Sequence, residues 1–379
     1  MLPKKLHKKL EDRKANNAYR QLSSANFPVD FSSNDYLGFS KSDKIFKTAH
    51  QHLIDNGILQ NGASGSRLLS GNHELYREIE AQISEFHNCE AALIFNSGYN
   101  ANIGILTCIA QRGDIILYDE LAHASIRDGI TMSNAKSYKF KHNDLQDLEN
   151  ILKRRSLSGA EVSRNPIETE IYIVTESVFS MDGDSPDISA LIQLCKTYDA
   201  HLIIDEAHAI GVFNQGLVDE PVFAKIVTYG KALGCHGAAI LGSKALKEYL
   251  INFSRPFIYT TALTPHTLAS IKCAYTELYE TSEIEKLEDN IRFFNSEIKR
   301  LNFQNTFIES ESAIHCCIIS GNDTVKHISK QLQNNGFDVK PILSPTVPKG
   351  SERLRFCLHS YNSKEDMTKV LELLATFVL

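Results

Sequence analysis

An alternation of short apolar runs with longer amphipathic runs, between residues 91 and 205, constrains the fold of this chain more than any other feature. The apolar runs have the length of β-strands and cover residues 91–95, 114–118, 137–140, 171–175 and 201–205. The amphipathic runs between them have helical periodicity and cover residues 99–110, 122–132, 144–153 and 188–198. Strands that alternate with helices predict an α/β fold, with a large, mainly parallel sheet covered by helices on both faces. In such sheets the ligand binds at the carboxyl ends of the strands.

The remaining segments predict an arm before this region and a smaller unit after it. Residues 1 to about 30 have the pattern of a helical arm, and a helix is expected near residues 75–86, after a glycine-rich stretch. Further elements are a strand at 238–241, helices at 245–252 and 265–300, strands at 314–319, 337–342 and 354–358, and helices at 323–335 and 364–378. We therefore predict an N-terminal arm (1–45), a large cofactor-binding domain (46–280) and a small C-terminal α+β domain (281–379).

Length and charge narrow the class of protein. The chain has 379 residues and a net charge of -6, which gives no reason to expect nucleic acid as a partner. Its longest apolar runs are too short to cross a membrane, and the basic N-terminus has no apolar core of the kind found in secretory signals. Eight cysteines are scattered without the spacing of a disulfide framework, so we expect reduced thiols and a cytoplasmic location.

One lysine has the sequence context of a reactive amine. Lys231 follows the apolar pair at 226–227 and lies among glycines and an alanine, which would let a flat ring approach closely. A lysine amine in such a place can form a Schiff base with an aldehyde. A second apolar strand ends in Asp205, with His208 three residues later. A lysine, an acid for a pyridine nitrogen and a donor for a ring hydroxyl are what pyridoxal phosphate requires, so we predict that cofactor.

Three other interpretations of these motifs fail on spacing. Residues 205–208 spell the DEAH box of a helicase family, but the phosphate loop that such ATPases need is absent, since Lys225 stands where its first glycine belongs. His315-Cys316-Cys317 lacks the paired spacing of zinc ligands, so we expect no metal and interpret His315 as part of a strand core. Residues 62–66 do not form the G-x-S-x-G turn of hydrolases.

Several stretches together resemble the α-oxoamine synthases, pyridoxal-phosphate enzymes of fold type I, from Arg20 to the C-terminal helix. These stretches are Phe31-Ser32-Ser33-Asn34-Asp35-Tyr36-Leu37-Gly38, Ser66-Arg67-Leu68-Leu69-Ser70-Gly71-Asn72, Asn96-Ser97-Gly98-Tyr99, His123-Ala124-Ser125, Glu176-Ser177-Val178-Phe179-Ser180-Met181-Asp182-Gly183-Asp184, Asp205-Glu206-Ala207-His208, Thr228-Tyr229-Gly230-Lys231, Pro345-Thr346-Val347-Pro348 and Arg353-Leu354-Arg355. Within that family the chain is most similar to the biotin-pathway member.

The resemblance implies a role for each residue of the cofactor set. Lys231 would hold the cofactor and later move the Cα proton of the substrate. Asp205 would pair with the pyridine nitrogen, His208 would bond the ring hydroxyl, and His123 would stack on the ring. The amides of Gly98 and Tyr99, at the start of a helix, would bind the phosphate. Thr228 and Ser180 would also contact the cofactor. The resemblance further implies a homodimer with its sites at the subunit interface, in which Thr260 or Thr261 would contact the cofactor phosphate of the neighbouring subunit.

The resemblance also implies substrate contacts and substrates. Arg355 would bind the carboxylate of the amino acid as a fork, and Arg20 and Asn34 would help to bind the acyl group. Cys357 stands near the expected acyl site, where a small hydroxyl residue is frequent, and Ala209 stands where many relatives have glycine. The substrates expected from the biotin-pathway member are L-alanine and a pimeloyl thioester.

Three functional hypotheses remain open on the sequence. The first is the biotin-pathway synthase, with either a coenzyme A or a carrier-protein thioester as acyl donor. The second is a sister enzyme that joins glycine or serine to another acyl group, such as a glycine acetyltransferase or a serine palmitoyltransferase. The third is a binding module that keeps the fold without catalysis, which the intact set of Lys231, Asp205 and His208 argues against.

Overall fold

The computed structural model describes residues 2–22, 27–162 and 169–378. The chain divides into two units. The larger unit comprises Leu37–Phe179 and Ser185–Ile284, and the smaller one comprises Met1–Tyr36, Ser180–Asp184 and Glu285–Leu379. The N-terminal segment thus groups with the C-terminal part of the chain, and five residues from the middle of the chain join them.

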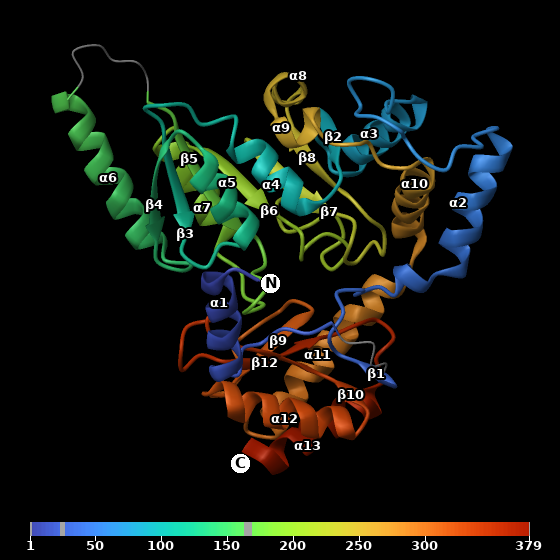
Figure 1. Ribbon diagram of the computed structural model, residues 1–379, viewed down its shortest axis with the longest axis vertical. Coiled ribbons are helices and arrows are strands. Elements are labelled where there is room, and N and C mark those ends of the chain that lie inside the picture. Colours follow the sequence, from blue (N-terminus) through green and yellow to red (C-terminus); the bar gives the residue numbers. More distant parts are fainter. Residues whose placement is uncertain (1, 23–26, 163–168, 379) are drawn as a thin grey trace. The chain divides into compact units, whose positions relative to one another are not determined.

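The larger unit is built on a seven-stranded sheet with the order β2-β8-β7-β6-β5-β3-β4 (Figure 1). The strands are β2 (Ala91–Phe95), β3 (Ile115–Asp119), β4 (Lys136–Phe140), β5 (Ile171–Glu176), β6 (His201–Asp205), β7 (Ala224–Thr228) and β8 (Ala238–Gly242). Only β8 is antiparallel to its neighbours, β2 and β7, so the other six strands all run in one direction. The predicted mainly parallel sheet is confirmed, and the carboxyl ends of those six strands lie along one edge.

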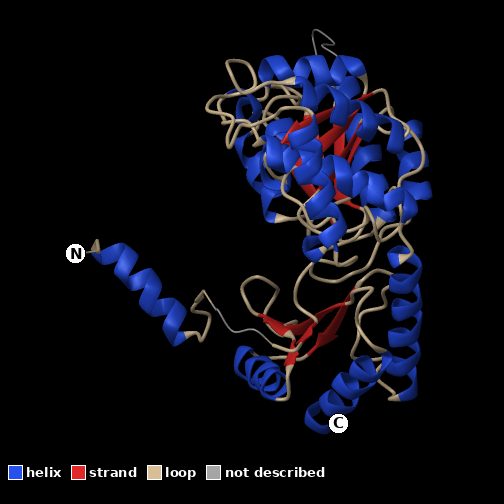
Figure 2. Ribbon diagram, turned by 90° about the vertical axis from the view of Figure 1, so that its right-hand side faces the viewer, coloured by secondary structure: helices blue, strands red, loops and turns tan. Residues whose placement is uncertain are grey.

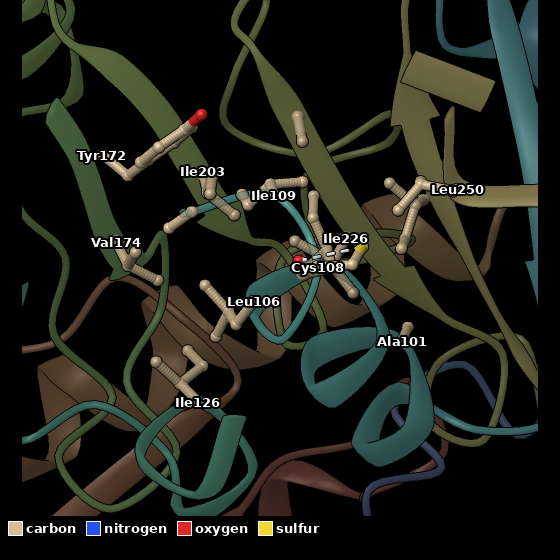
Figure 3. Close-up of a cluster of buried hydrophobic side chains, with 14 of the residues drawn as sticks. Ala101, Leu106, Cys108, Ile109, Ile126, Tyr172, Val174, Ile203, Ile226 and Leu250 are labelled. Carbon is tan, nitrogen blue, oxygen red and sulfur yellow. Dashed lines mark hydrogen bonds between the residues drawn. The ribbon is translucent and has the colours of Figure 1, made fainter. Parts of the chain in front are cut away.

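Helices cover both faces of this sheet. Successive side chains of a strand point to opposite faces, and here both faces carry apolar side chains that the helices bury. On one face Val174, Ile203 and Ile226 pack against a cluster that includes α4 (Gly98–Leu106) and α5 (Ala124–Met132). Figure 3 shows Leu106 of α4 and Ile126 of α5 near Val174 in this core. The neighbouring positions Ile173 and Ile204 lie on the other face with α6 (Leu145–Val162) and α7 (Ile188–Thr197). The short α8 (Lys244–Phe253) and α9 (Arg255–Ile258) complete the first cluster.

Two predicted helices have different bounds in the structure. The helix predicted at 99–110 ends at Leu106, although residues 108–110 continue to bury apolar side chains in the same core. The helix predicted at 265–300 is wrong as a single element, since α10 (Pro265–Glu280) stops and α11 (Glu283–Arg300) begins after it. Thr281 takes an extended conformation there, and its hydroxyl accepts a hydrogen bond from the Glu283 N–H, which starts the second helix.

The remaining helices of the larger unit are α2 (Asp43–Asp55) and α3 (Glu74–Phe86), which both contact α10. The helix predicted near 75–86 is therefore confirmed, whereas α2 was not predicted. Figure 2 shows the strands of the large sheet surrounded by helices.

The smaller unit has an antiparallel sheet of β11 (Lys340–Ile342), β12 (Arg353–Cys357) and β9 (Ile314–Ile318). A second, two-stranded sheet pairs β1 (Val29–Asp30) with β10 (Phe337–Asp338) in parallel. The strand predicted at 337–342 is therefore two strands in different sheets. The helices of this unit are α1 (Lys4–Ala15), α12 (Asn322–Asn334) and α13 (Lys364–Val378), together with most of α11. In the described part of the chain, no helix combines the length and the apolar character needed to cross a membrane.

Candidate active site

The carboxyl edge of the large sheet gathers the residues that the sequence singled out in this unit. Asp205 is the last residue of β6 and Thr228 is the last residue of β7. His123 precedes α5, a few residues after β3 ends, and Gly98 begins α4 just after β2. Because these strands run in one direction, their ends bring all four residues to the same edge.

Lys231 and His208 contact each other at this edge. The distance from Lys231 Nζ to His208 Nε2 is 2.7 Å, which is a hydrogen bond. Lys231 lies in a tight turn, closed by a hydrogen bond from the Gly234 N–H to the Lys231 carbonyl. Gly234 has a φ of +62°, and a Cβ built on it would lie 2.1 Å from the backbone nitrogen of Ser40. Only glycine fits this position, so the turn that presents Lys231 depends on it.

Asp205 is 6% exposed and accepts two hydrogen bonds. The Ala207 N–H donates to Oδ1 over 2.9 Å, and Asn102 Nδ2 on α4 donates to Oδ2 over 2.7 Å. Two donors to a buried carboxylate stabilise its negative charge. This arrangement suits an acid that must hold a proton on a neighbouring ring nitrogen.

His123 is anchored through both its backbone and its ring. Its N–H donates to Glu176 Oε1 over 2.7 Å, and its Nδ1 accepts from the Ser125 N–H at the start of α5. Although the residue as a whole is exposed, partial burial of the ring and the charge of Lys231 lower the pKa of His123, and the Asp205 charge opposes that shift. The ring is therefore a neutral imidazole near pH 7.

Glu176 adds a second buried acid to the edge. It is the last residue of β5 and stands opposite Asp205 in the register of β5 and β6. Burial, followed by the negative charge of Asp205, raises the pKa of Glu176 to about 8, and the charge of Lys231 opposes these effects. Since the charges of Lys231 and Asp205 both act on Glu176 and on His123, the four groups form one electrostatic cluster.

The start of α4 forms a cradle for an anion. Ser97 caps the helix by accepting a hydrogen bond from the Asn100 N–H, and the N–H groups of Gly98 and Tyr99 belong to the first turn. The Thr228 hydroxyl would lie 3.6 Å from a Cβ built on Gly98, so it stands beside this helix start. A helix N-terminus with an adjacent hydroxyl suits a phosphate group.

Taken together, the amine, the two-donor carboxylate, the neutral imidazole and the anion cradle fit pyridoxal phosphate in the chemistry that each part of the cofactor needs. Thr260 and Thr261 follow α9, and Asn96 Nδ2 donates to the Thr261 carbonyl over 2.7 Å. Their expected contact with a neighbouring subunit stays a prediction.

The residues predicted to bind substrate lie in the smaller unit, and most of them contact one another. Arg355 on β12 donates through Nε to the Ser180 carbonyl over 2.7 Å and through Nη2 to Asn34 Oδ1 over 2.9 Å. Cys357 is fully buried, and its Sγ lies 3.8 Å from Asn34 Oδ1. Arg20 is exposed, and its Nη2 lies 3.5 Å from the Thr346 hydroxyl. Arg355 is buried, so it is not an arginine of the open surface.

The residues that were weighed as metal ligands lie in a strand of the smaller unit. His315, Cys316 and Cys317 are buried in β9, so the interpretation of His315 as part of a strand core is confirmed. Among the described residues, no group of three or more His, Cys, Asp or Glu side chains could hold a metal ion.

Asn102 and Glu176 were not predicted as site residues. One available signal was the pair of adjacent strands that each end in an acid, Glu176 and Asp205. The other was Asn102, which lies on the buried face of α4, whereas the second asparagine of this helix, Asn100, is not buried.

The fold and the site define a member of a large enzyme family. The sequence matches the family "Aminotransferase class I and II" over residues 28–374, so the chain belongs to that family. Its enzymes depend on pyridoxal phosphate, which confirms the predicted cofactor, and their fold is the predicted fold type I.

Curated relatives narrow the family to the α-oxoamine synthases, which are acyltransferases. The 8-amino-7-oxononanoate synthase of Emericella nidulans is 39% identical over 373 residues, which cover 92% of this chain and 89% of that one. A Methanococcus vannielii protein that provisionally carries the same name is 39% identical over 383 residues and 98% of each chain.

Solved structures agree with this placement. The crystal structure of 8-amino-7-oxononanoate synthase from Francisella tularensis is 27% identical, with a TM-score of 0.75 over 92% of this chain and 97% of that one. The serine palmitoyltransferase of Sphingomonas wittichii is 24% identical, with a TM-score of 0.83 over 100% and 98% of the two chains, and it supports the fold.

Proposed function

We propose that the protein condenses L-alanine with a pimeloyl thioester, from coenzyme A or a carrier protein, to give 8-amino-7-oxononanoate for biotin synthesis. Carbon dioxide and the free thiol leave in this reaction. The observation that carries the proposal is the Lys231–His208 contact of 2.7 Å, beside the buried Asp205, in a chain whose curated relatives bear that name at 39% identity.

The larger unit supplies the groups that hold the cofactor and move the proton. Pyridoxal phosphate, when bound, withdraws electrons from the substrate Cα so that its proton can leave. Lys231 Nζ would hold the cofactor through its aldehyde and would take the Cα proton of the substrate. Asp205 would keep a proton on the pyridine nitrogen, and His208 would bond the ring hydroxyl. The face of the neutral His123 ring would support the cofactor, and the start of α4 with Thr228 would bind the phosphate.

The smaller unit supplies the groups that recognise the substrates. Arg355 binds the carboxylate of L-alanine, and its bonds to the Ser180 carbonyl and to Asn34 hold its guanidinium plane in one orientation. Such orientation sets which bond of Cα breaks. Ser180 contributes to the cofactor contacts, while Arg20, Asn34 and Cys357 contribute to the acyl site.

We also propose a homodimer in which Thr260 or Thr261 contacts the cofactor phosphate of the partner subunit. The larger unit has exposed large apolar side chains that a partner would cover, such as Leu59, Leu69 (85% exposed) and Tyr259. Tyr259 directly precedes the two threonines. A cytoplasmic location is proposed as well, and the thiol form of the eight cysteines supports it.

The test is a thiol-release assay with the purified enzyme and pyridoxal phosphate. L-alanine, glycine and L-serine are each supplied with pimeloyl-CoA, and the product is identified by mass spectrometry. The proposal expects product from L-alanine at a kcat/KM at least about tenfold above those for the other two amino acids, which corresponds to about 1.4 kcal/mol. A preference for glycine or serine would instead assign the protein to a sister synthase.

Lys231→Ala should abolish turnover, because among the described residues no other amine at this edge can bind the aldehyde and move the proton. Lys196→Ala, which removes an exposed lysine that pairs with Glu220, is the matched control and should keep the activity of the wild type. Turnover by Lys231→Ala at the rate of the control would contradict the assigned role of Lys231.

A further inference from the structure

A chain of hydrogen bonds joins the two residues that are expected to contact the cofactor ring. Asn102 Nδ2 lies 2.7 Å from Asp205 Oδ2 and 3.1 Å from Ser125 Oγ. Ser125 Oγ in turn lies 2.7 Å from His123 Nδ1. Asn102 and Ser125 are almost completely buried, on α4 and α5 respectively, so the chain runs through the interior from the carboxylate to the imidazole.

The directions of these hydrogen bonds follow from a backbone donor. The Ser125 N–H lies 3.2 Å from His123 Nδ1 and can only donate, so Nδ1 must be the acceptor and the ring proton must be on Nε2. The Ser125 hydroxyl then also donates to Nδ1 and accepts from Asn102. The Asn102 amide faces Asp205 with its NH2 group, because its oxygen would repel the carboxylate oxygen at 2.7 Å.

The oxygen of the Asn102 amide helps to explain why an asparagine lies at this position of α4. Asn102 Oδ1 is buried and accepts no hydrogen bond from the described residues. A buried acceptor without a partner is destabilising. Packing alone would favour an apolar residue on this face of α4, so the two donated hydrogen bonds explain the asparagine better than packing does.

We propose that Asn102 and Ser125 are positioning residues that hold His123 as the neutral imidazole with its proton on Nε2 and fix the orientation of the Asp205 carboxylate. This inference rests on the proposed function, in which these two residues contact the cofactor. A protonated His123 would have to break both bonds to Ser125, and a positive ring would disfavour the protonated pyridine nitrogen beside Asp205. This chain of hydrogen bonds through Asn102 and Ser125, which we call the relay, thus keeps the imidazole neutral and the carboxylate aligned.

The test is 15N NMR of the full-length protein with labelled histidine, with and without pyridoxal phosphate, and with the His123 signal assigned from His123→Gln. The wild type should show His123 as the neutral form with hydrogen on Nε2 in both states. Ser125→Ala should raise the pKa of His123 by about half a unit to one unit, the shift expected from one lost hydrogen bond to the neutral ring. Ser125→Thr keeps the hydroxyl and should keep the titration of the wild type.

The ionisable groups around His123 stay the same in these variants: the acids are Asp205, Asp128 and Glu176, and the bases are Lys231 and Arg127. Thr131→Ala on α5 removes a hydroxyl that, among the described residues, bonds only the Arg127 carbonyl of its own helix. This variant is therefore the matched control and should leave His123 unchanged. Asn102→Ala should shift the titration in the same direction as Ser125→Ala and should also weaken cofactor retention about tenfold or more, because a charged acceptor loses its donor.

The NMR results test the role of Asn102 and Ser125 independently of whether the enzyme turns over its substrates. A wild-type His123 with its proton on Nδ1, or a titration that is equal in Ser125→Ala and Thr131→Ala, would overturn it even if the enzyme makes the proposed product. Conversely, an enzyme that fails to release thiol with any amino acid but shows the expected His123 spectra would overturn the proposed function and leave the relay in place.

Discussion

Glu176→Gln should change how the stability of the protein depends on pH. Glu176 is buried at the end of β5 opposite Asp205, and its pKa is raised from its ordinary value to about 8 by burial first and by the Asp205 charge second. In the unfolded chain the same carboxyl ionises near 4.5. Between these values the folded protein holds a proton that the unfolded chain has lost.

The sign follows from this difference in bound protons. Below pH 4.5 the carboxyl is protonated in both states, so it contributes no pH dependence. As pH rises from about 5 to 8, the unfolded state is stabilised by ionisation, and the free energy of unfolding of the wild type falls by up to about 1.4 kcal/mol per unit. Over that window the loss reaches about 4 kcal/mol at most. Because the charges of Asp205 and Lys231 are coupled to the ionisation of Glu176, we expect at least about half of this loss in the free energy of unfolding to be observed.

The assay is denaturant unfolding of the cofactor-free protein at pH 5, 6, 7 and 8. The glutamine keeps an oxygen that can accept the His123 N–H but cannot ionise. The difference in free energy of unfolding, Glu176→Gln minus wild type, should therefore grow with pH by about 2 kcal/mol or more between pH 5 and 8.

Glu78→Gln is the matched control on α3. The ion pair with Lys272 lowers the pKa of Glu78, so this carboxyl is ionised in both states throughout the window. Its difference from wild type should not change with pH. A flat curve for Glu176→Gln as well would refute the conclusion that the buried acid is protonated.

Two further predictions test the turn of Lys231 and the role of Arg355. Gly234→Ala should lower the free energy of unfolding by about 3 kcal/mol, because its Cβ would collide with the Ser40 backbone at a φ of +62°. Gly57→Ala has a similar φ of +65° and no atom within 4 Å, so it should cost only about 1 kcal/mol in thermal unfolding, and equal losses would contradict the steric argument. Arg355→Lys should raise the KM for L-alanine at least about tenfold in steady-state kinetics, since the fork to the carboxylate is lost. Arg292→Lys, an exposed control, should not, and an unchanged KM for Arg355→Lys would remove Arg355 from the carboxylate site.

Sequence periodicity predicted the large sheet well, because the feature that defines a strand there is local. The five strands predicted between residues 91 and 205 lie within one residue of their predicted bounds. The break between α10 and α11 was missed because it depends on one residue, Thr281, whose hydroxyl starts the second helix. The pairing of β1 with β10 joins segments some 300 residues apart, and no local pattern encodes such a partner.

The candidate site divides in the same way. The closeness of Lys231 and His208 at the sheet edge that also carries Asp205 could be predicted, because each of the three residues lies at or just after the end of a strand. The contribution of Asn102 was not predicted, because an asparagine is chemically neutral and its role comes from the groups that it faces. The grouping of Ser180 with the smaller unit is also a property of the folded chain, since Phe179 belongs to the other unit.

The two acids at the sheet edge show how the surroundings divide charge between similar groups. Asp205 and Glu176 end adjacent strands and face each other in register, so both cannot easily be ionised in a buried place. Asp205 receives hydrogen bonds from the Ala207 N–H and from Asn102, one on each carboxylate oxygen. Glu176 receives a backbone hydrogen bond from His123 on Oε1, and burial raises its pKa to about 8.

The pKa of Glu176 is raised to about 8, so Glu176 keeps its proton near pH 7, while Asn102 gives the Asp205 carboxylate a second donor. The charge is then located on the acid that the proposed mechanism needs beside the pyridine nitrogen. If Asn102 were replaced by alanine, the advantage of Asp205 would shrink, and Glu176 would compete for the charge. In Asn102→Ala the free energy of unfolding should therefore fall less between pH 5 and 8 than it does in the wild type. Unfolding curves of Asn102→Ala, Glu176→Gln and the double mutant measure this coupling directly.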